Sequence, residues 1–260
     1  MGTASLLEAV RALRKPCVVL VVTTDKCYEN REHVWGYREI DAMGGHDPYS
    51  ASKGAAELVV SSYRRSFFDP ARVREHRVKL ASARAGNVIG GGDFKADAIV
   101  PDLVRSWMAG VPLEVRSPDA VRPWQHVLDC LSGYLSLSAQ MLQDDAARWC
   151  DAWNFGPLAG SELPVRDLVR RFLDEWGDGD WLDKSDPRQP HEAKTLRLSV
   201  DKAMWELRWR PRWAVDEAVQ RTAEWYRRWH AEGASPRELC EEQIEAWLAA
   251  GQEQAAGVLS

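Results

Sequence analysis

The sequence lacks the features that define several classes of protein. Its longest run of apolar residues, Cys17–Val22, is far shorter than the ~20 residues that a membrane-spanning helix needs, so we expect no membrane partner. Its five cysteines are widely scattered and form no C-x-x-C pair, which argues against a zinc site or a disulfide framework. No basic segment followed by an apolar one opens the chain, as a secretory leader would. These absences favour a cytoplasmic protein with reduced thiols and no bound metal.

Positive charge is also in deficit. The 260 residues include 34 Lys and Arg against 39 Asp and Glu, which gives a formal net charge of −5 at pH 7. An acidic chain is a poor non-specific binder of nucleic acid, so we expect no nucleic-acid partner. Apolar residues make up 45% and charged residues 28% of the chain. This composition is ordinary for a globular protein with one large or two small domains.

Strand and helix patterns alternate along the first part of the chain. An apolar stripe predicts a helix over Gly2–Leu13, and the unbroken apolar run Cys17–Val22 predicts a strand buried on both faces in a parallel sheet. Asp47 as N-cap and Pro48 at the first helical position predict a helix that runs to about residue 68. The segment Val78–Ala85 indicates the next strand. This alternation is typical of the α/β class.

The second part of the chain is less regular. A helix is expected over 99–109, and beyond residue 111 the pattern loosens into short strands and helices. No internal repeat interrupts it. The segments concerned are 128–142, 165–176, 200–207 and 215–229, followed by a last helix around 239–248.

The segment YSASK, residues 49–53, is the sharpest local feature. Tyr49 and Lys53 are four residues apart and therefore share one face of the predicted helix. An ammonium group beside a phenol stabilises the phenolate, which makes a proton shuttle for alcohol-to-ketone chemistry. Tyr and Lys also meet at this spacing by chance on many amphipathic helices, so the pair alone does not establish a site.

Polar residues follow the first predicted strand, where open α/β sheets place their ligands. Thr24 is a candidate hydrogen-bond partner of a substrate hydroxyl, Asp25 a candidate general acid and Lys26 a candidate base. Each could also be a solvated loop residue or a helix cap. Together with Asn87, which follows the next strand, they point to a catalytic site.

Longer stretches resemble the nucleotide-sugar 4,6-dehydratases of the extended short-chain dehydrogenase/reductase superfamily, and among them the CDP-glucose 4,6-dehydratases. The superfamily signature is Tyr-x-x-x-Lys preceded by Thr or Ser at a strand end, which matches Tyr49, Lys53 and Thr24. Lys26 favours the CDP-glucose enzymes, since the related dTDP-glucose enzymes usually carry Glu there. The matching stretches are TDKCYEN (24–30), DPYSASKGAAE (47–57), ARAGNVIGGGD (83–93), RPWQHV (122–127), WNFGP (153–157) and HEA (191–193).

The resemblance implies an internal redox cycle on CDP-glucose with NAD as cofactor. Tyr49, assisted by Lys53 and Thr24, takes the proton of the sugar 4-hydroxyl while C4 is oxidised. Lys26 removes the proton at C5, Asp25 protonates the departing 6-hydroxyl, and C6 is then reduced. The product is CDP-4-keto-6-deoxyglucose, and NAD is regenerated. Tyr49 and Lys53 are thus expected to contact NAD as well as the sugar.

For substrate binding the resemblance implies Asn87, Arg122, Asn154 and His191. The forked guanidinium of Arg122 suits a diphosphate. Without the resemblance, Arg122 would be interpreted as part of a surface ion pair and His191 as a structural histidine. The glycines 90–92 lack the lysine and the spacing of a P-loop, so we interpret them as a turn.

One part of the family pattern is not found in the sequence. The family opens with a strand, a G-x-x-G-x-x-G turn and a helix whose N-terminus holds the NAD pyrophosphate, and Met1 matches the middle of that domain. We therefore expect an incomplete doubly wound, Rossmann-like parallel sheet within residues 1–112. A smaller mixed α/β, mainly substrate-binding region follows over 113–233, and a tail with one helix over 234–260.

Three alternatives remain open. The chain is a working dehydratase whose start lies upstream or whose missing part comes from another chain, or it is an inactive remnant that binds a nucleotide sugar. A nucleotide-sugar epimerase is a third interpretation, and it is weaker because Asp25 and Lys26 have no evident use in that reaction. Family analogy also implies a homodimer formed through the helices 2–13 and 47–68.

Overall fold

Two compact units make up the molecule. The computed structural model describes residues 1–143, 147–186, 188 and 195–257. The chain passes repeatedly from one unit to the other, so neither unit is a continuous stretch of sequence, and the predicted functional division at residues 112 and 233 stays a prediction. The first unit comprises Met1–Gly86, Cys130–Ala159 and Leu196–Arg210, and the second comprises Asn87–Asp129, Gly160–Thr195 and Pro211–Ser260.

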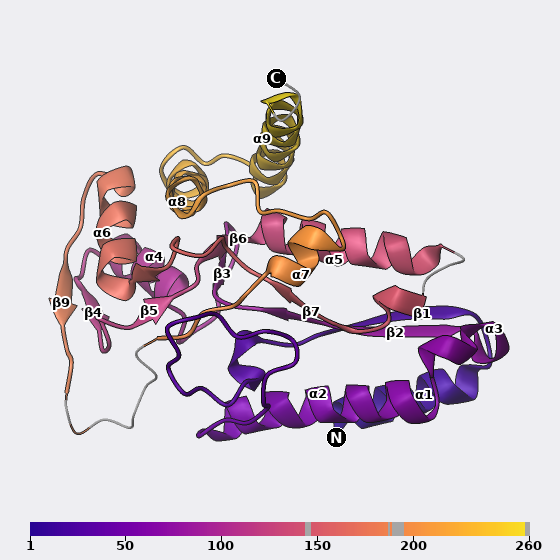
Figure 1. Ribbon diagram of the computed structural model, residues 1–260. Coiled ribbons are helices and arrows are strands. Elements are labelled where there is room, and N and C mark those ends of the chain that lie inside the picture. The colour runs from indigo at the N-terminus through magenta and orange to yellow at the C-terminus, as the bar shows by residue number, and fades with distance from the viewer. Residues whose placement is uncertain (144–146, 187, 189–194, 258–260) are drawn as a thin grey trace. The chain divides into compact units, whose positions relative to one another are not determined.

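A three-stranded parallel sheet forms the centre of the first unit (Figure 1). β1 (Cys17–Val22) pairs with β2 (Val78–Ala85), with Val22 opposite Ala83, and β2 pairs with β7 (Ala152–Phe155). Because all three strands are parallel, their carboxyl ends meet at the same edge of the sheet. The predicted strands and the parallel sheet are confirmed.

Helices cover both faces of this sheet (Figure 1). α1 (Gly2–Leu13) and α2 (Pro48–Ser66) lie on one face, and α5 (Val127–Leu142) and the short α7 (Asp201–Trp205) lie on the other. The side chains of β1 alternate between the two hydrophobic clusters, as the period of a strand requires. Val19 and Val21 pack with the α1 and α2 cluster, and Val18 and Leu20 pack with the opposite one.

β1 is packed on both faces, and in the described part of the chain it is the edge strand of its sheet. None of its residues is fully buried, and Val22 is 52% exposed. Both faces of β1 carry apolar contacts, but it is the edge strand of its sheet, and within the described part of the chain its only ladder is with β2. The predicted packing of both faces is therefore confirmed, and the partial exposure comes from the position of β1 at the edge of the sheet, because an apolar run reports contacts above and below a strand and not beside it.

The second unit contains short strands in pairs rather than one sheet. Two of the pairs are parallel and one is antiparallel. The parallel pairs are β3 (Val88–Ile89) with β6 (Gln125–His126) and β4 (Leu113–Val115) with β9 (Trp181–Asp183), and the antiparallel pair is β5 (Val121–Arg122) with β8 (Leu163–Pro164).

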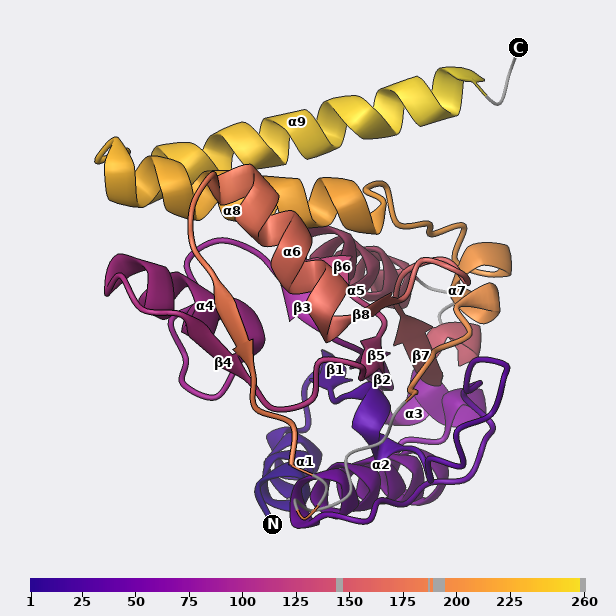
Figure 2. The same cartoon turned by 90° about the vertical axis from the view of Figure 1, so that its left-hand side faces the viewer.

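Four helices surround these ladders: α4 (Ile99–Met108), α6 (Val165–Trp176), α8 (Val215–Ala231) and α9 (Pro236–Gly257). α8 and α9 run side by side (Figure 2). The sequence pattern predicts α4, α6 and α8 within a few residues, whereas α9 extends well beyond the expected 239–248. Its outer turns carry no apolar stripe, so periodicity could not mark them.

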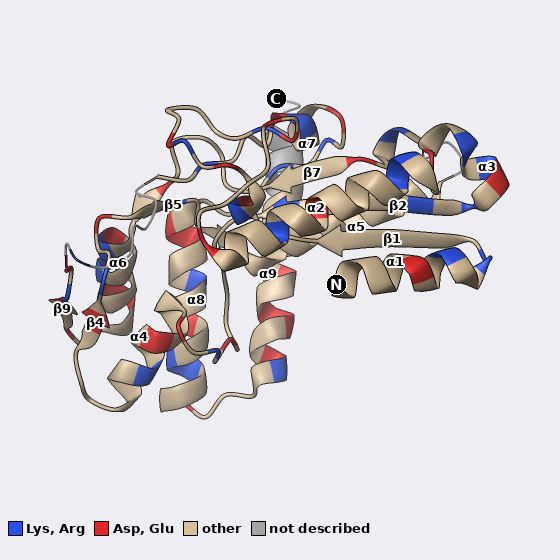
Figure 3. Ribbon diagram, turned by 90° about the horizontal axis from the view of Figure 1, so that it is seen from below, with Lys and Arg blue, Asp and Glu red and all other residues tan. Residues whose placement is uncertain are grey.

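Charged residues of both signs lie along α8 and α9 (Figure 3). Arg228 of α8 forms an ion pair with Glu242 of α9, which joins the two helices across their exposed sides. Within the described residues, no helix is both long and apolar enough to cross a membrane. The remaining short helices are η1 (Asp25–Cys27), η2 (Pro70–Arg72), α3 (Val73–His76) and η3 (Ala147–Trp149).

Candidate functional site

The carboxyl end of β1 carries the first group of predicted site residues. Thr24 caps the short helix η1 by accepting a hydrogen bond from the Lys26 N–H at 3.3 Å. The Thr24 hydroxyl donates to the Asp25 carboxylate at 3.0 Å. Asp25 is only 2% exposed, whereas Lys26 is exposed to solvent. The turn therefore places a buried carboxylate next to an accessible amine at a strand end.

The start of α2 is fixed by its cap. The Asp47 carboxylate accepts hydrogen bonds from the Ser50 N–H at 2.9 Å and from the Ser50 hydroxyl at 2.5 Å. These bonds lower the pKa of Asp47 below its ordinary value. Pro48 occupies the first turn, where its missing N–H costs nothing. The helix start that the sequence predicts is confirmed.

Tyr49 and Lys53 lie one turn apart on α2, as their spacing predicts. The Lys53 ammonium is 5.6 Å from the centre of the Tyr49 ring. Tyr49 is 52% exposed and Lys53 is half-buried. The Tyr49 phenol is therefore accessible to a ligand, and the Lys53 ammonium lies beside its ring.

α2 packs closely against η1, and a glycine makes this possible. A Cβ at Gly54 would lie 3.2 Å from the Cys27 carbonyl oxygen, which is tighter than ordinary van der Waals contact. Burial raises the pKa of the Cys27 thiol to about 12, so this thiol stays protonated and is no nucleophile. The close approach sets the helix of Tyr49 and Lys53 against the turn that carries Asp25.

A buried ion pair lies beneath this arrangement. The Glu57 carboxylate, on α2, accepts a hydrogen bond from Arg84 Nη2 at 2.8 Å, and the two side chains are 3% and 4% exposed. The Ser82 hydroxyl donates to the same carboxylate at 2.8 Å, and the Thr23 hydroxyl also donates to it. Burial alone would raise the pKa of Glu57, but the hydrogen bonds and the charge of Arg84 lower it below its ordinary value.

Asn154 belongs to the same polar network. Its side-chain oxygen accepts from the Tyr28 hydroxyl at 2.7 Å, and its Nδ2 donates to the carbonyls of Tyr37 (2.9 Å) and Ser199 (3.1 Å). The Asn154 N–H donates to the Glu39 carboxylate at 2.9 Å, and burial raises the pKa of Glu39. Asn154 is fully buried, so a contact with substrate requires one of these bonds to be replaced, and its predicted role stays a prediction.

The other predicted substrate residues are placed as follows. Asn87 follows β2 at the start of the second unit, where its carbonyl accepts from the Gln125 N–H at 3.0 Å. Arg122 is 5% exposed on β5 and donates through Nη1 to the Val121 carbonyl at 2.9 Å. It is thus buried rather than on the surface. His191 lies outside the described residues, and all three assignments stay predictions.

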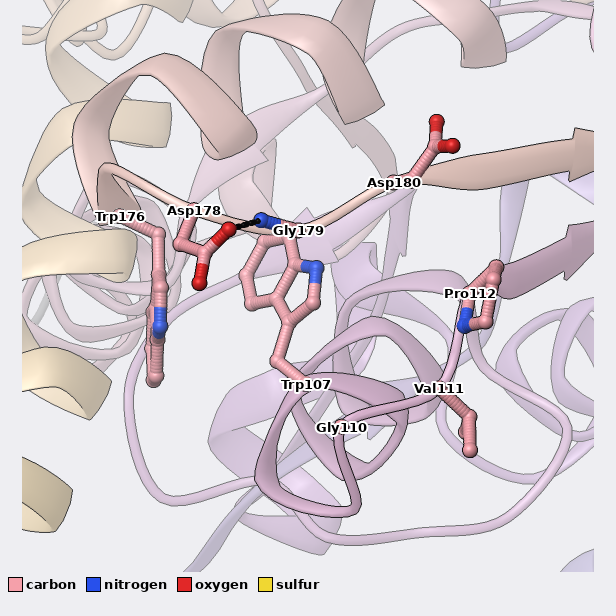
Figure 4. A pocket seen from close by; sticks show the side chains of 8 residues that line it. All are labelled: Trp107, Gly110, Val111, Pro112, Trp176, Asp178, Gly179 and Asp180. Atoms are coloured by element: carbon pink, nitrogen blue, oxygen red, sulfur yellow. Dashed lines mark hydrogen bonds between the residues drawn. The ribbon is translucent and has the colours of Figure 1, made fainter.

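The glycines 90–92 form a turn, as expected. A Cβ at Gly91 would lie 2.1 Å from the Trp225 ring, so the residue is small because an indole packs on it. The second unit also has an open pocket of about 320 Å³, in which Trp107, Trp176 and Asp178 lie close together (Figure 4). None of the predicted site residues that the structure describes lines this pocket. Among the described residues, no cluster of His, Cys, Asp and Glu is arranged to hold a metal ion.

Sequence reasoning missed Glu57, Arg84 and Tyr28, which connect the predicted groups. Two signals could have found them. Glu57 continues the spacing of four from Tyr49 and Lys53, and Arg84 is a charge within a strand that is otherwise mostly apolar. A buried strand tolerates such a charge only when it is paired.

Relatives of known activity match most of the chain. A CDP-glucose 4,6-dehydratase of Salmonella typhimurium is 47% identical over 230 residues, which are 88% of this chain and 64% of that protein. A dTDP-glucose 4,6-dehydratase of Streptomyces antibioticus is 32% identical over 230 residues, 87% of this chain and 62% of that protein. The chain thus spans less than two thirds of the length of these two relatives.

The fold is shared with solved structures. The dTDP-glucose 4,6-dehydratase of Streptomyces venezuelae, with NAD and TYD bound, aligns with a TM-score of 0.71 and 26% identity, over 90% of this chain and 67% of that one. The predicted Rossmann-like class is thereby confirmed. The family model for GDP-mannose 4,6 dehydratase matches residues 1–222. The chain therefore belongs to this family of nucleotide-sugar 4,6-dehydratases, as its sequence resemblance predicts.

Proposed function

We propose that this chain carries out the dehydration of CDP-glucose to CDP-4-keto-6-deoxyglucose. The observation that carries the proposal is the placement of Tyr49 and Lys53 on a helix packed against the turn with Thr24, Asp25 and Lys26. One compact unit thus holds a phenol, two amino groups, a hydroxyl and a carboxyl group. The choice of CDP-glucose is supported by the 47% identical relative and by Lys26.

The residues present fit the nicotinamide end of NAD, since the phenol of Tyr49 is exposed and the Lys53 ammonium lies beside it. NAD, when bound, supplies the reversible oxidation and reduction of the sugar. Tyr49 takes the proton of the 4-hydroxyl, and the positive charge of Lys53 stabilises the phenolate that does so. The oxygen of Thr24 accepts a hydrogen bond from the substrate, because its own proton is directed to Asp25.

Loss of water needs an acid and a base in one site. Lys26, which is accessible, takes the C5 proton as a neutral amine and becomes the ammonium, after the 4-ketone has made that proton acidic. Asp25, which is buried, gives its proton as the carboxylic acid to the departing 6-hydroxyl, which leaves as water, and becomes the carboxylate. Their adjacent positions in η1 direct the two side chains differently, so that one serves C5 and the other C6.

We also propose that two copies of the chain pair through α1 and α2. Leu6 and Leu13 of α1 and Leu58 of α2 are 54%, 49% and 62% exposed, which leaves apolar surface on both helices. Sedimentation of the purified chain measures this association.

The test is turnover by the purified chain with NAD and CDP-glucose, followed by mass spectrometry for the loss of one water. We expect product from the wild type and a fall of at least ~100-fold for Tyr49→Phe, which keeps the ring and removes the proton-transferring oxygen. The same assay with dTDP-glucose tests which nucleobase the chain prefers in its substrate. Folded protein whose melting temperature rises with CDP-glucose but which forms no product would contradict the proposal and favour a binding protein.

A further inference from the structure

We propose that Glu57 is a positioning residue: its buried carboxylate holds α2, and with it Tyr49 and Lys53, in place against the strand end that carries Thr24. The inference rests on the proposed function, because it concerns the same site. Glu57 itself is buried and does not face a ligand.

The first argument is its place on the helix. Residues 49, 53 and 57 follow one another at a spacing of four and lie on one stripe of α2. Tyr49 and Lys53 are accessible, whereas Glu57 is 3% exposed. The stripe thus leaves the solvent-facing start of the helix and enters the interior two turns later. A contact at Glu57 therefore fixes how deeply α2 is buried and how it is rotated about its axis, and with that the positions of Tyr49 and Lys53.

The second argument is what the carboxylate binds. One of its oxygens accepts from the hydroxyl of Thr23, the residue directly before Thr24. The other oxygen accepts from Ser82 and Arg84, both on β2, at 2.8 Å each. One side chain of α2 is therefore tied to the ends of two neighbouring strands. These strands are in register, with Val22 opposite Ala83.

The third argument is that Arg84 extends the tie to the turn after η1. Its Nη1 donates to the Tyr28 hydroxyl at 2.8 Å and to the Glu39 carbonyl at 3.1 Å. Tyr28 directly follows η1, which carries Asp25 and Lys26. The pair Glu57–Arg84 thus links the helix of the proton shuttle to the turn of the acid and the base.

Stability alone is a weak reason for such a pair. Two charges that are removed from water lose their hydration. The attraction between them in the interior offsets this loss only when their geometry is good. Apolar side chains of similar volume therefore often stabilise a fold equally well. What apolar side chains do not supply is direction. Three donors on one carboxylate fix where the helix lies relative to the strand ends, and proton transfer is sensitive to such placement.

The experiment separates positioning from stability with three variants. Glu57→Gln keeps the shape and removes the charge. Glu57→Gln combined with Arg84→Met removes both charges, so that no unpaired buried charge remains. Asp151→Asn is the matched control. It removes the carboxylate that pairs with Lys202 and with Arg64 (3.1 Å), and Arg64 lies on α2 at the end opposite to Tyr49. For each variant, kcat, KM and melting temperature are measured with NAD and CDP-glucose.

We expect kcat to fall ~10–100-fold in Glu57→Gln, with KM little changed, because misplaced groups slow the reaction more than they weaken binding. The double variant is expected to regain melting temperature but not kcat. The control is expected to lose melting temperature and keep kcat. Wild-type kcat in Glu57→Gln, or recovery of kcat together with melting temperature in the double variant, would overturn the proposal.

A second readout does not depend on turnover. Hydrogen exchange of residues 25–28 and 49–53 is expected to speed up in Glu57→Gln and in the double variant but not in the control. Unchanged exchange in these two segments would overturn the positioning role. If the wild type forms no product while exchange changes as expected, the proposed function fails and the positioning role stands.

Discussion

The two units of the molecule both enclose aromatic rings, but they differ in the polar side chains that they bury. The first unit encloses the ion pair of Glu57 and Arg84, and a chain of hydrogen bonds runs on from Arg84 through Tyr28 to Asn154. The second unit encloses aromatic rings, which pack edge to face and offset around α8. Its largest buried or nearly buried rings belong to Trp124, Phe172, Trp225 and Tyr226.

This difference teaches what each interior does. The free energy gained by burying apolar surface is roughly proportional to the buried area and depends little on direction. An aromatic core therefore stabilises a unit without fixing the position of any one atom. Hydrogen bonds to a buried charge demand defined distances and angles. The unit with the directional interior is also the one that carries Tyr49, Lys53 and the residues of η1.

The second unit has its own buried polar groups, among them Asp129 and His126. Asp129 accepts hydrogen bonds from the N–H of Arg212 at 2.7 Å and from Trp247 Nε1 at 2.8 Å, which ties α9 and the approach to α8 to the start of α5. His126 is fully buried, and its Nε2 has no hydrogen-bond partner among the described residues. A lone neutral group of this kind responds to pH in a way that the ion pair of the first unit does not.

The largest effect is expected from breaking the buried pair of the first unit on one side. Arg84→Ala leaves the Glu57 charge buried without its cation, and we expect the free energy of unfolding to fall by ~3–5 kcal/mol. Urea denaturation followed by circular dichroism measures this change. Arg72→Ala is the control, because Arg72 pairs with Glu75 on the exposed surface and is expected to have little effect. Equal, small effects of the two substitutions would remove the contrast between the interiors.

An intermediate effect is expected from pH in the second unit. Burial, with the nearby charge of Arg221, lowers the pKa of His126 from 6.5 to about 4. The fold thus favours neutral His126, so its contribution to stability is present above pH 6.5 and is lost as the pH falls toward 4. Between pH 7 and pH 5 this loss amounts to ~2 kcal/mol.

The measurement is urea unfolding followed by tryptophan fluorescence at both pH values. His126→Gln, which cannot titrate, is expected to lack this part of the pH dependence. The same loss of stability in wild type and variant would show that His126 does not sense pH in this range.

The smallest effect is expected at the start of α2. Asp47→Ala removes the acceptor for the Ser50 N–H, and a lost N-cap costs ~1 kcal/mol of stability. Asp47→Asn keeps a capping oxygen and is expected to stay close to the wild type. Melting temperatures of the three proteins give the comparison. A melting temperature of Asp47→Ala equal to that of the wild type would mean that packing against η1 alone holds the helix start.

Much of the first unit could be predicted from sequence because the signals are local. The apolar run of β1, the Asp47–Pro48 helix start and the spacing of Tyr49 and Lys53 each involve residues within a few positions of one another. Helix and strand periods act over the same short range, which is why α1, α2, β1 and β2 are found where expected. The outer turns of α9 carry no such period and were missed.

The tertiary structure decided which polar residues are paired. Asn154 and Tyr28 are 126 positions apart in the chain, and Arg84 and Glu57 are 27 apart, yet each pair shares a hydrogen bond in the interior. The sequence by itself determined the family, the parallel α/β class and the spacing that places Tyr49 and Lys53 one turn apart on the same helix. It could not determine that the side chain of Asn154 is hydrogen-bonded within the protein, or that Glu57 of α2 forms a buried ion pair with Arg84. Those facts depend on which strands lie next to each other, and that is settled only when distant parts of the chain exclude water together.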